Sequence, residues 1–457
     1  MFRGPRRTPF APLITDMSDN SRWYSAMEWI GFAGLTLFCF FSLLGTAGAS
    51  LGLALMLLAL LLSPEAWRRL PRHSLFWAAV LSIAYLLASR YILTAGLAGD
   101  MDIRNNQTRD WVQIFLFPVI GWWISRHPGR YLYGLGLMLG GFTLGILHSL
   151  WEMDLSGLLG GIRTGMHFGK PVIFGFVCAV AILAMFTLSA FWLNPRLEFS
   201  RTRRALSLGA TLLMLLFYAQ GLVFSQSRGV WLALLVTLPV VSAILWHGLK
   251  AGQVVDKRRW GWAGLVAIML VASAVAFNWK IITERVAYEN EVFGVVLSEG
   301  LDEAPLDSST YRLHLWRFGI RRWLERPLFG WGPGMTESLV ETENTEALKH
   351  DGKESFDHLH NAYLELLLQL GLVGMCFVSW LAALMVVCLV RHFRRRDVSV
   401  YWFSFLMGNF VLIAVYSLTD FRHLHWNWRF YWLILAGIVF AQCIVMPQKR
   451  GGEQSPE

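Results

Sequence analysis

Charged residues are scarce in this sequence. They make up 16% of its 457 residues, against about 25% in soluble domains, while hydrophobic residues make up 55%. The apolar residues fall in long blocks, and a soluble core would split into domains beyond roughly 250–300 residues. The composition therefore excludes an ordinary soluble protein and favours many membrane spans. The 22 Trp and 31 Phe residues suit aromatic belts at two membrane interfaces.

Cysteine is also rare. The chain has five, each inside an apolar run: Cys39, Cys178, Cys376, Cys388 and Cys443. Their spacing fits neither a metal site nor a disulfide framework. We therefore expect them to be small buried hydrophobic residues.

Twelve apolar runs each approach the ~20 residues that a helix needs to cross the hydrocarbon core. They lie at 24–44, 47–63, 74–94, 110–125, 131–150, 171–193, 205–224, 228–246, 260–279, 361–390, 401–419 and 428–446. The first run is long and is followed at once by another, which favours a membrane hairpin over a cleaved signal. We predict an all-α, polytopic membrane protein with about 12 transmembrane helices.

Basic residues follow every even-numbered span, for example Arg68 and Arg69 after the second and Arg394 to Arg396 after the tenth. This pattern is typical of an orientation signal, so the net charge of +9 does not indicate a nucleic-acid partner. These loops and both termini are predicted to be cytoplasmic, which makes the other loops external.

One large external loop is predicted at 283–360, between membrane parts at 1–282 and 361–457. Residues 281–357 contain fifteen acidic and eight basic residues, a net charge of −7. The acidic loop therefore faces away from the basic side of the membrane.

The loop contains a helix signal of its own. Leu313, Trp316 and Ile320 recur at helical spacing after a Ser-Ser-Thr cap, and Pro327 ends the pattern. We predict an amphipathic helix at the membrane surface, and a polar, acidic loop over residues 336–357.

Three arginines stand at the predicted external face, against the charge bias. Arg163 lies between spans five and six, Arg228 begins span eight, and Arg312 falls in the first turn of the predicted loop helix. A guanidinium binds phosphate through two parallel hydrogen bonds and stays charged at any working pH. We predict a diphosphate clamp, with a snorkelling membrane anchor as the alternative for each arginine. Lys170 is assigned as an anchor.

Two histidines, His358 and His360, stand where span ten enters the membrane. No acid or cysteine accompanies them at a fixed spacing, so no metal site is predicted. His360 is predicted to act as a general base or a donor to the substrate, because histidine titrates near working pH. The last external loop carries four further polar residues: Asp420, Arg422, His423 and His425. It is interpreted as a short solvated turn with internal ion pairs, and the alternative is that these residues join the candidate site.

Residues 360–374 resemble a known family pattern. His360 and Asn361 are followed by nine residues and then by Gly371-Leu-Val-Gly374, which is similar to the O-antigen ligase and Wzy-type polymerase superfamily. Eleven residues of helix turn through about 1100°, near a whole number of turns, so His360 and Gly371 are expected to share one face. Gly371 and Gly374 would then let another helix or a lipid tail approach closely.

Two upstream blocks resemble the same superfamily. One opens at Tyr311-Arg312 and continues into a glycine-rich turn, and the other is Arg228-Gly-Val-Trp-Leu232. The resemblance covers roughly residues 221–374. It implies a GT-C-like membrane fold with one large periplasmic loop, in the inner membrane of a bacterium.

Three activities compete within the superfamily. A ligase moves finished O-antigen from undecaprenyl diphosphate to the lipid A-core oligosaccharide, a polymerase joins repeat units on the carrier, and a protein O-oligosaccharyltransferase glycosylates Ser or Thr. Polymerases are associated with an Arg-x10-Gly pattern, but Phe174, Pro239 and Trp323 follow the three arginines at that offset. Protein-glycosylating members tend to be longer. The resemblance therefore favours the ligase, with the other two activities as alternatives.

A ligase implies that His360, Arg312 and Arg228 are catalytic, with the histidine taking or steering a hydroxyl proton and the arginines stabilising the departing diphosphate. Substrate-binding roles are implied for four more residues: Arg163, Asn361, Gly371 and Tyr311. The implied partners are the undecaprenyl diphosphate-linked donor, the lipid A-core acceptor and membrane lipids. No cofactor or metal is expected, and the transfer is expected to invert configuration.

Two alternatives lie outside this class. Twelve helices are natural for a transporter or flippase, which should show functional polar residues within spans and internal repeats. The sequence has few charges within the predicted spans and no convincing repeat. A structural membrane protein is the other alternative, and it would not need His and Arg gathered on one face.

Overall fold

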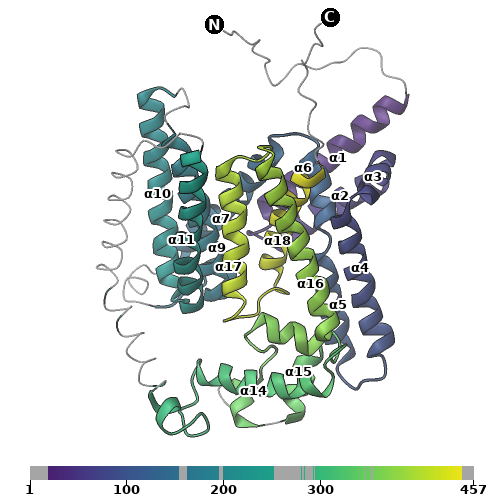
Figure 1. Cartoon of the computed structure of the whole chain (residues 1–457), viewed down its shortest axis with the longest axis vertical. Coiled ribbons are helices and arrows are strands. Elements are labelled where there is room, and N and C mark those ends of the chain that lie inside the picture. Colours follow the sequence, from purple (N-terminus) through teal and green to yellow (C-terminus); the bar gives the residue numbers. More distant parts are fainter. Residues whose placement is uncertain are drawn as a thin grey trace, which may run out of the picture.

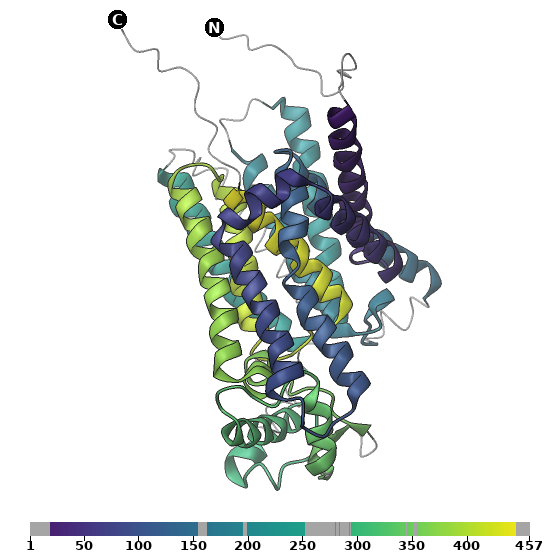
Figure 2. The same ribbon diagram turned by 90° about the vertical axis from the view of Figure 1, so that its right-hand side faces the viewer.

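The computed structural model describes residues 19–153, 162–194, 199–251, 279, 283, 292, 294–343, 345–350 and 354–444. Helices form nearly all of the regular structure in these ranges, and β1 (Lys349–His350) and β2 (Glu354–Ser355) form one antiparallel pair. The long helices make a bundle, and α14 (Thr310–Glu325) and α15 (Met335–Glu343) lie across one end of it (Figure 1). A view turned by 90° keeps this green segment at the same end (Figure 2).

Eight of the described helices are long and apolar enough to cross a membrane. They are α1 (Asp19–Phe41), α4 (Ser74–Ala88, continued by η2, Ser89–Leu93), α7 (Arg130–Glu152), α9 (Pro171–Trp192), α10 (Arg201–Ser225), α11 (Arg228–Ala251), α16 (Ala362–Arg394) and α18 (Trp426–Ile444). The prediction of a polytopic, helical membrane protein is confirmed.

The total of twelve spans stays a prediction. α2 (Thr46–Leu61) meets the segment formed by α3 (Pro64–Arg69) and η1 (Leu70–Arg72) at a bend of 71°. If these two parts form one bent span, it is a ninth candidate. α17 (Val400–Tyr416) is apolar but shorter. The predicted span at 260–279 lies outside the described residues, except for its last one.

The span predicted at 110–125 is not a single helix. The structure has α5 (Met101–Ile114) and α6 (Phe117–Ser125), with Pro118 in the first turn of α6. Proline has no amide hydrogen to donate, so it suits the start of a new helix. Every residue from 117 to 124 is buried, because α6 packs tightly on α18. With 9 residues, α6 is too short to cross a membrane alone.

The predicted amphipathic helix is confirmed as α14. Leu315 and Phe318 on its buried face join an apolar cluster with Leu339 of α15, whereas Ile320 and Leu324 stay exposed. The polar segment that follows is not all loop, because α15 occupies Met335–Glu343 and buries its own apolar face in this cluster. The exposed apolar side chains of Ile320 and Leu324 suit a helix, α14, that rests on a membrane surface.

Gly371 breaks α16, with φ of 66° and ψ of −171°. Leu328 of the glycine-rich turn lies so close that an added Cβ at Gly371 would be 2.3 Å from its carbonyl oxygen. Backbone hydrogen bonds from Leu372 to Pro327 (2.9 Å) and from Val373 to Leu328 (3.1 Å) fix this contact. The expectation that His360 and Gly371 share a helical face is therefore wrong, since α16 begins after His360 and is kinked at Gly371.

Two of the five cysteines form a disulfide, so the prediction that all five are simply buried hydrophobic residues is wrong for this pair. Cys388 of α16 and Cys443 of α18 are 55 positions apart, with Cα atoms 6.2 Å from each other. Cys39 and Cys178 are buried as expected, whereas Cys376 is exposed. Sequence spacing cannot show a pairing between helices so far apart in the chain.

Candidate active site

His360 stands in the turn before α16 and has a left-handed backbone conformation, with φ of 50°. Its Nδ1 lies 3.0 Å from Oδ1 of Asp420, a buried residue in the connection between α17 and α18. Arg422 Nε lies 3.7 Å from the other carboxylate oxygen. When Nδ1 donates to Asp420, Nε2 is the ring nitrogen that can accept a proton. The three residues form a His–Asp–Arg chain.

The surroundings of Asp420 keep it ionised. Burial by itself raises the pKa of this carboxyl, but the charge of Arg422 and the hydrogen bond with His360 hold the pKa well below its ordinary value. An ionised carboxylate behind Nδ1 stabilises the protonated imidazole that forms when Nε2 takes a proton.

His358 differs from His360. Burial, reinforced by the nearby charges of His360 and Arg422, lowers the pKa of His358 to about 3. The two rings are 4.2 Å apart between centroids. A neutral ring of such low basicity is a poor general base near pH 7, so the arrangement favours His360 for that role.

The loop between α17 and α18, which was predicted to be external, contains the expected internal ion pair between Arg422 and Asp420 but is not a solvated turn. Asp420 is 2% exposed, and burial lowers the pKa of His423 to about 3 and of His425 to about 4. The loop is therefore part of the packed site. The prediction of a solvated loop was wrong because the segments that cover the loop come from distant parts of the chain.

The fold also supplies the acid that sequence spacing does not show beside the histidines. His358, His360 and Asp420 place potential ligand atoms within 4.8 Å of one another. Arg422 shares the carboxylate of Asp420, and its positive charge disfavours a cation there. The expectation that the site needs no metal therefore stays a prediction.

Arg228 begins α11 and reaches the start of α14. Its Nη2 donates to Ser308 Oγ over 3.1 Å. The next residue, Gly229, is so close to Thr419 that an added Cβ would be 2.1 Å from the Thr419 hydroxyl oxygen. Arg228 thus lies between the start of α14 and the loop that carries Asp420.

Arg312 lies in the first turn of α14. It is within electrostatic range of Tyr416, and so are Asp420 and Arg422 of the loop that follows α17. One turn further on, Trp316 Nε1 donates to the carbonyl of Leu359, which directly precedes His360, over 3.1 Å. α14 is thereby held against the turn of His360, with Arg312 on the side of the Asp420 loop.

Arg163 belongs to the segment between α7 and α9, and its side chain contacts the turn between α10 and α11. Its Nε donates to the carbonyl oxygen of Ser225 over 3.0 Å, three residues before Arg228. Lys170 is within electrostatic range of His425. The three predicted arginines therefore come from separate segments to one end of the bundle, around the α10–α11 turn and the start of α14.

The other predicted substrate-binding residues have structural contacts. Asn361 caps α16, since its Oδ1 accepts from the amides of Tyr363 (3.0 Å) and Leu364 (3.1 Å). The rings of Tyr311 and Phe356 lie 5.4 Å apart between centroids, tilted by 56°, and Phe356 also borders the His360 ring. Gly371 contacts the turn at Leu328, as described above. Contact of these residues with substrate stays a prediction.

Glu365, which is not among the predicted site residues, is fully buried one turn into α16. One carboxylate oxygen accepts the amide of Leu359 over 2.8 Å, and the other accepts the Thr336 hydroxyl and, over 2.7 Å, the side-chain amide of Gln369. Glu365 thereby fixes the backbone between the two histidines and ties it to α15. The available signal was a carboxylate inside a predicted span, which is costly unless it has a role.

An apolar cavity of about 230 Å³ lies beside the site, between α16, α17 and α18. Tyr363, Leu366, Phe410 and Trp432 are among the residues that line it, and His423 also contributes to its wall. The cavity therefore offers an apolar chain a place within the membrane part, next to the His–Asp–Arg chain.

Residues 210–379 match the family model described as O-Antigen ligase. This chain carries a domain of the O-antigen ligase family. The O-antigen ligase domain runs from α10 into α16, so it includes Arg228, Arg312 and His360 but neither Arg163 nor Asp420. Such a domain indicates an enzyme of the ligase or polymerase type, a membrane glycosyltransferase acting in O-antigen metabolism. No curated protein matches the chain.

Proposed function

We propose that this protein is an O-antigen ligase of the bacterial inner membrane. It transfers O-antigen polysaccharide from undecaprenyl diphosphate to the lipid A-core oligosaccharide on the periplasmic side. The observation that carries the proposal is the His360–Asp420–Arg422 chain at the end of the bundle where Arg228 and Arg312 also lie. A general base beside cationic groups is what a transfer from a diphosphate carrier requires.

In the proposed reaction, a hydroxyl oxygen of the core sugar attacks the anomeric carbon of the donor. The bond from that carbon to the diphosphate oxygen breaks, the electron pair leaves with the diphosphate, and configuration inverts. The hydroxyl proton passes to Nε2 of His360, and Asp420 stabilises the resulting imidazolium.

Arg228 and Arg312, with Arg163, are proposed to hold the diphosphate and to neutralise the charge that develops as it leaves. Their guanidinium groups give planar pairs of donors that match phosphate oxygens. The apolar cavity beside Tyr363 and Leu366 supports this orientation, because it can take part of the isoprenoid chain while the diphosphate faces the arginines.

The test is reconstitution of the purified protein with lipid-linked O-antigen and a lipid A-core acceptor. We expect the glycan on the core and free undecaprenyl diphosphate as products. Longer carrier-linked chains without core modification would assign a polymerase instead, and transfer to a protein acceptor would assign a protein oligosaccharyltransferase.

The same assay tests the role of metal. We expect activity to persist in EDTA, because the arginines carry the charge stabilisation. Loss of activity on chelation, with recovery on adding Mg²⁺ or Mn²⁺, would assign a metal to His358, His360 and Asp420 and overturn this leaving-group mechanism.

A further inference from the structure

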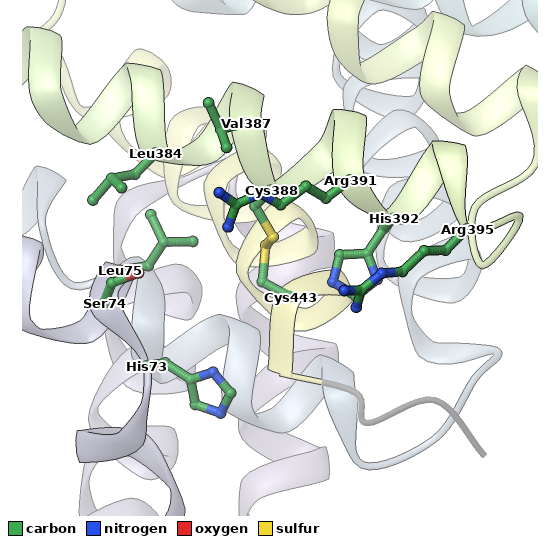
Figure 3. Close-up of a pocket in the computed structure, with 10 residues that line it drawn as sticks. All are labelled: His73, Ser74, Leu75, Leu384, Val387, Cys388, Arg391, His392, Arg395 and Cys443. Atoms are coloured by element: carbon green, nitrogen blue, oxygen red, sulfur yellow. A yellow bond between two sulfur atoms is a disulfide. The ribbon is translucent and has the colours of Figure 1, made fainter. Parts of the chain in front are cut away.

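A second cavity, of about 260 Å³, lies at the other end of α16 from His360. It is lined by the end of α16, the start of α4 and the end of α18, where the Cys388–Cys443 disulfide joins α16 to α18 (Figure 3). A cavity of this volume holds several water molecules, which is the scale of a headgroup rather than a whole lipid.

One face of α16 lines this cavity from apolar to basic. Leu384, Val387, Arg391 and Arg395 follow one another at intervals of three or four residues, so their side chains share one side of the helix. They extend over about 16 Å of the helix axis. An amphiphile with an apolar chain and an anionic head has this same gradient of polarity.

The charge of the cavity is positive. Arg391 and Arg395 pair with no carboxylate in the described part of the chain, and Asp397, which is close by, lies 3.2 Å from His392 Nδ1. His73, which directly precedes α4, also lines the cavity (Figure 3). Burial lowers the pKa of His73, so its ring is a neutral hydrogen-bonding partner near pH 7 while the arginines supply the charge.

We infer that this cavity binds the phosphate group of an anionic phospholipid, with the start of its acyl chain along Leu384 and Val387. Basic pockets between transmembrane helices bind anionic headgroups in this way, and guanidinium groups match phosphate oxygens. The site is separate from the transfer reaction, since it lies at the opposite end of α16 from the proposed active site.

The test uses native mass spectrometry of the full-length protein with added phosphatidylglycerol, with phosphatidylcholine as a lipid of no net charge. We expect phosphatidylglycerol to be retained in preference to phosphatidylcholine. The double variant Arg391→Gln/Arg395→Gln should lose phosphatidylglycerol affinity by about tenfold or more.

Arg394→Gln/Arg396→Gln is the matched control, because it removes the same charge from the same helix end but from side chains outside the cavity. We expect it to retain the lipid as the wild type does. Equal losses in both double variants would mean that the basic helix end attracts anionic lipid without a site. Equal retention of the two lipids by the wild type would also overturn the inference.

Two further arms complete the experiment. Arg391→Lys/Arg395→Lys keeps the charge but lacks the planar pairs of donors, so it should retain more phosphatidylglycerol than the Gln variant and less than the wild type. Thermal unfolding of each variant separates lost binding from a folding defect. In the second arm, inorganic phosphate is added without lipid. If the wild type binds phosphate, the Gln variant does not, and no phospholipid is retained, the cavity is a phosphate site and the lipid proposal is overturned.

Discussion

At the scale of single residues, His358 and His360 are two positions apart but have different neighbours. His360 pairs with the ionised Asp420, whereas His358 is a buried neutral ring. We predict that His360→Ala lowers turnover by roughly 10²–10⁴-fold and that His358→Ala lowers it much less. Turnover of the purified variants in the ligation assay measures this. Equal, mild losses in both would remove His360 from the proton transfer.

Arginine geometry is a second property of single residues. We predict that Arg312→Lys and Arg228→Lys each cause a large loss of activity with normal membrane insertion, because lysine keeps the charge but lacks the planar pair of donors. Initial rates and protein levels in membranes measure the two effects separately. Arg317→Lys, on the same helix as Arg312 but paired with the exposed Asp302, is the control and should be neutral. If all three variants match the wild type, the arginines are membrane anchors.

The buried histidines predict how stability depends on pH. In the unfolded chain histidine titrates at about pH 6.5, whereas the pKa of His358 is about 3 and that of His425 about 4 in the folded protein. Between about pH 3 and 6.5 the unfolded state therefore binds more protons than the folded state. The stability that these neutral histidines contribute is fully present above about pH 6.5 and falls as the pH is lowered. Asp420, with its depressed pKa, adds stability above about pH 3.9 that is lost only below that value.

Replacing His358 by Gln removes one of the groups that takes up a proton when the chain unfolds. We predict that the pH slope of the unfolding free energy then falls, by up to about 1.4 kcal/mol per pH unit between about pH 4 and 6.5. Thermal unfolding of the detergent-solubilised protein across this range measures it. An unchanged slope would show that His358 titrates normally in the folded protein.

At the scale of elements, the glycine motif joins two backbones. Gly371 has a positive φ, and an added Cβ would meet the Leu328 carbonyl. We predict that Gly371→Ala destabilises the protein by at least about 1–3 kcal/mol, through backbone strain alone, and exposes the turn at Leu328 to proteases. Gly136→Ala in α7, where nothing lies within 4 Å, should be neutral or slightly stabilising. A fully stable Gly371→Ala variant would return this glycine to the lipid-contact role expected from spacing.

At the scale of the whole molecule, α14 and the basic end of α16 lie at opposite ends of the bundle (Figure 1). We predict that cysteines placed at the exposed Glu303 and Arg394, in a Cys376→Ala background, react with an impermeant maleimide from opposite sides of the membrane. Position 303 should label in intact spheroplasts and position 394 only after permeabilisation. Labelling of both from one side would contradict the predicted span count.

The sequence by itself determined the membrane class, most long helices and the amphipathic α14, and it proposed His360, Arg228 and Arg312 as site residues. The length of an apolar run and its helical periodicity are local properties of the sequence. These two properties are enough to predict which segments form membrane-spanning or amphipathic helices. The family motif was likewise contained in short stretches of chain.

Only the tertiary structure decided the surroundings of these residues. It brought Asp420 to His360 across 60 positions and buried Glu365 against Leu359. It also placed Gly371 on the turn at Leu328 and Cys388 beside Cys443. Each of these contacts joins separate segments, and the packing of whole helices sets its distance, so no local pattern contains it. The ionisation of Asp420 and of His358 follows from that packing, because burial and neighbouring charge fix a pKa and neither can be read along the chain.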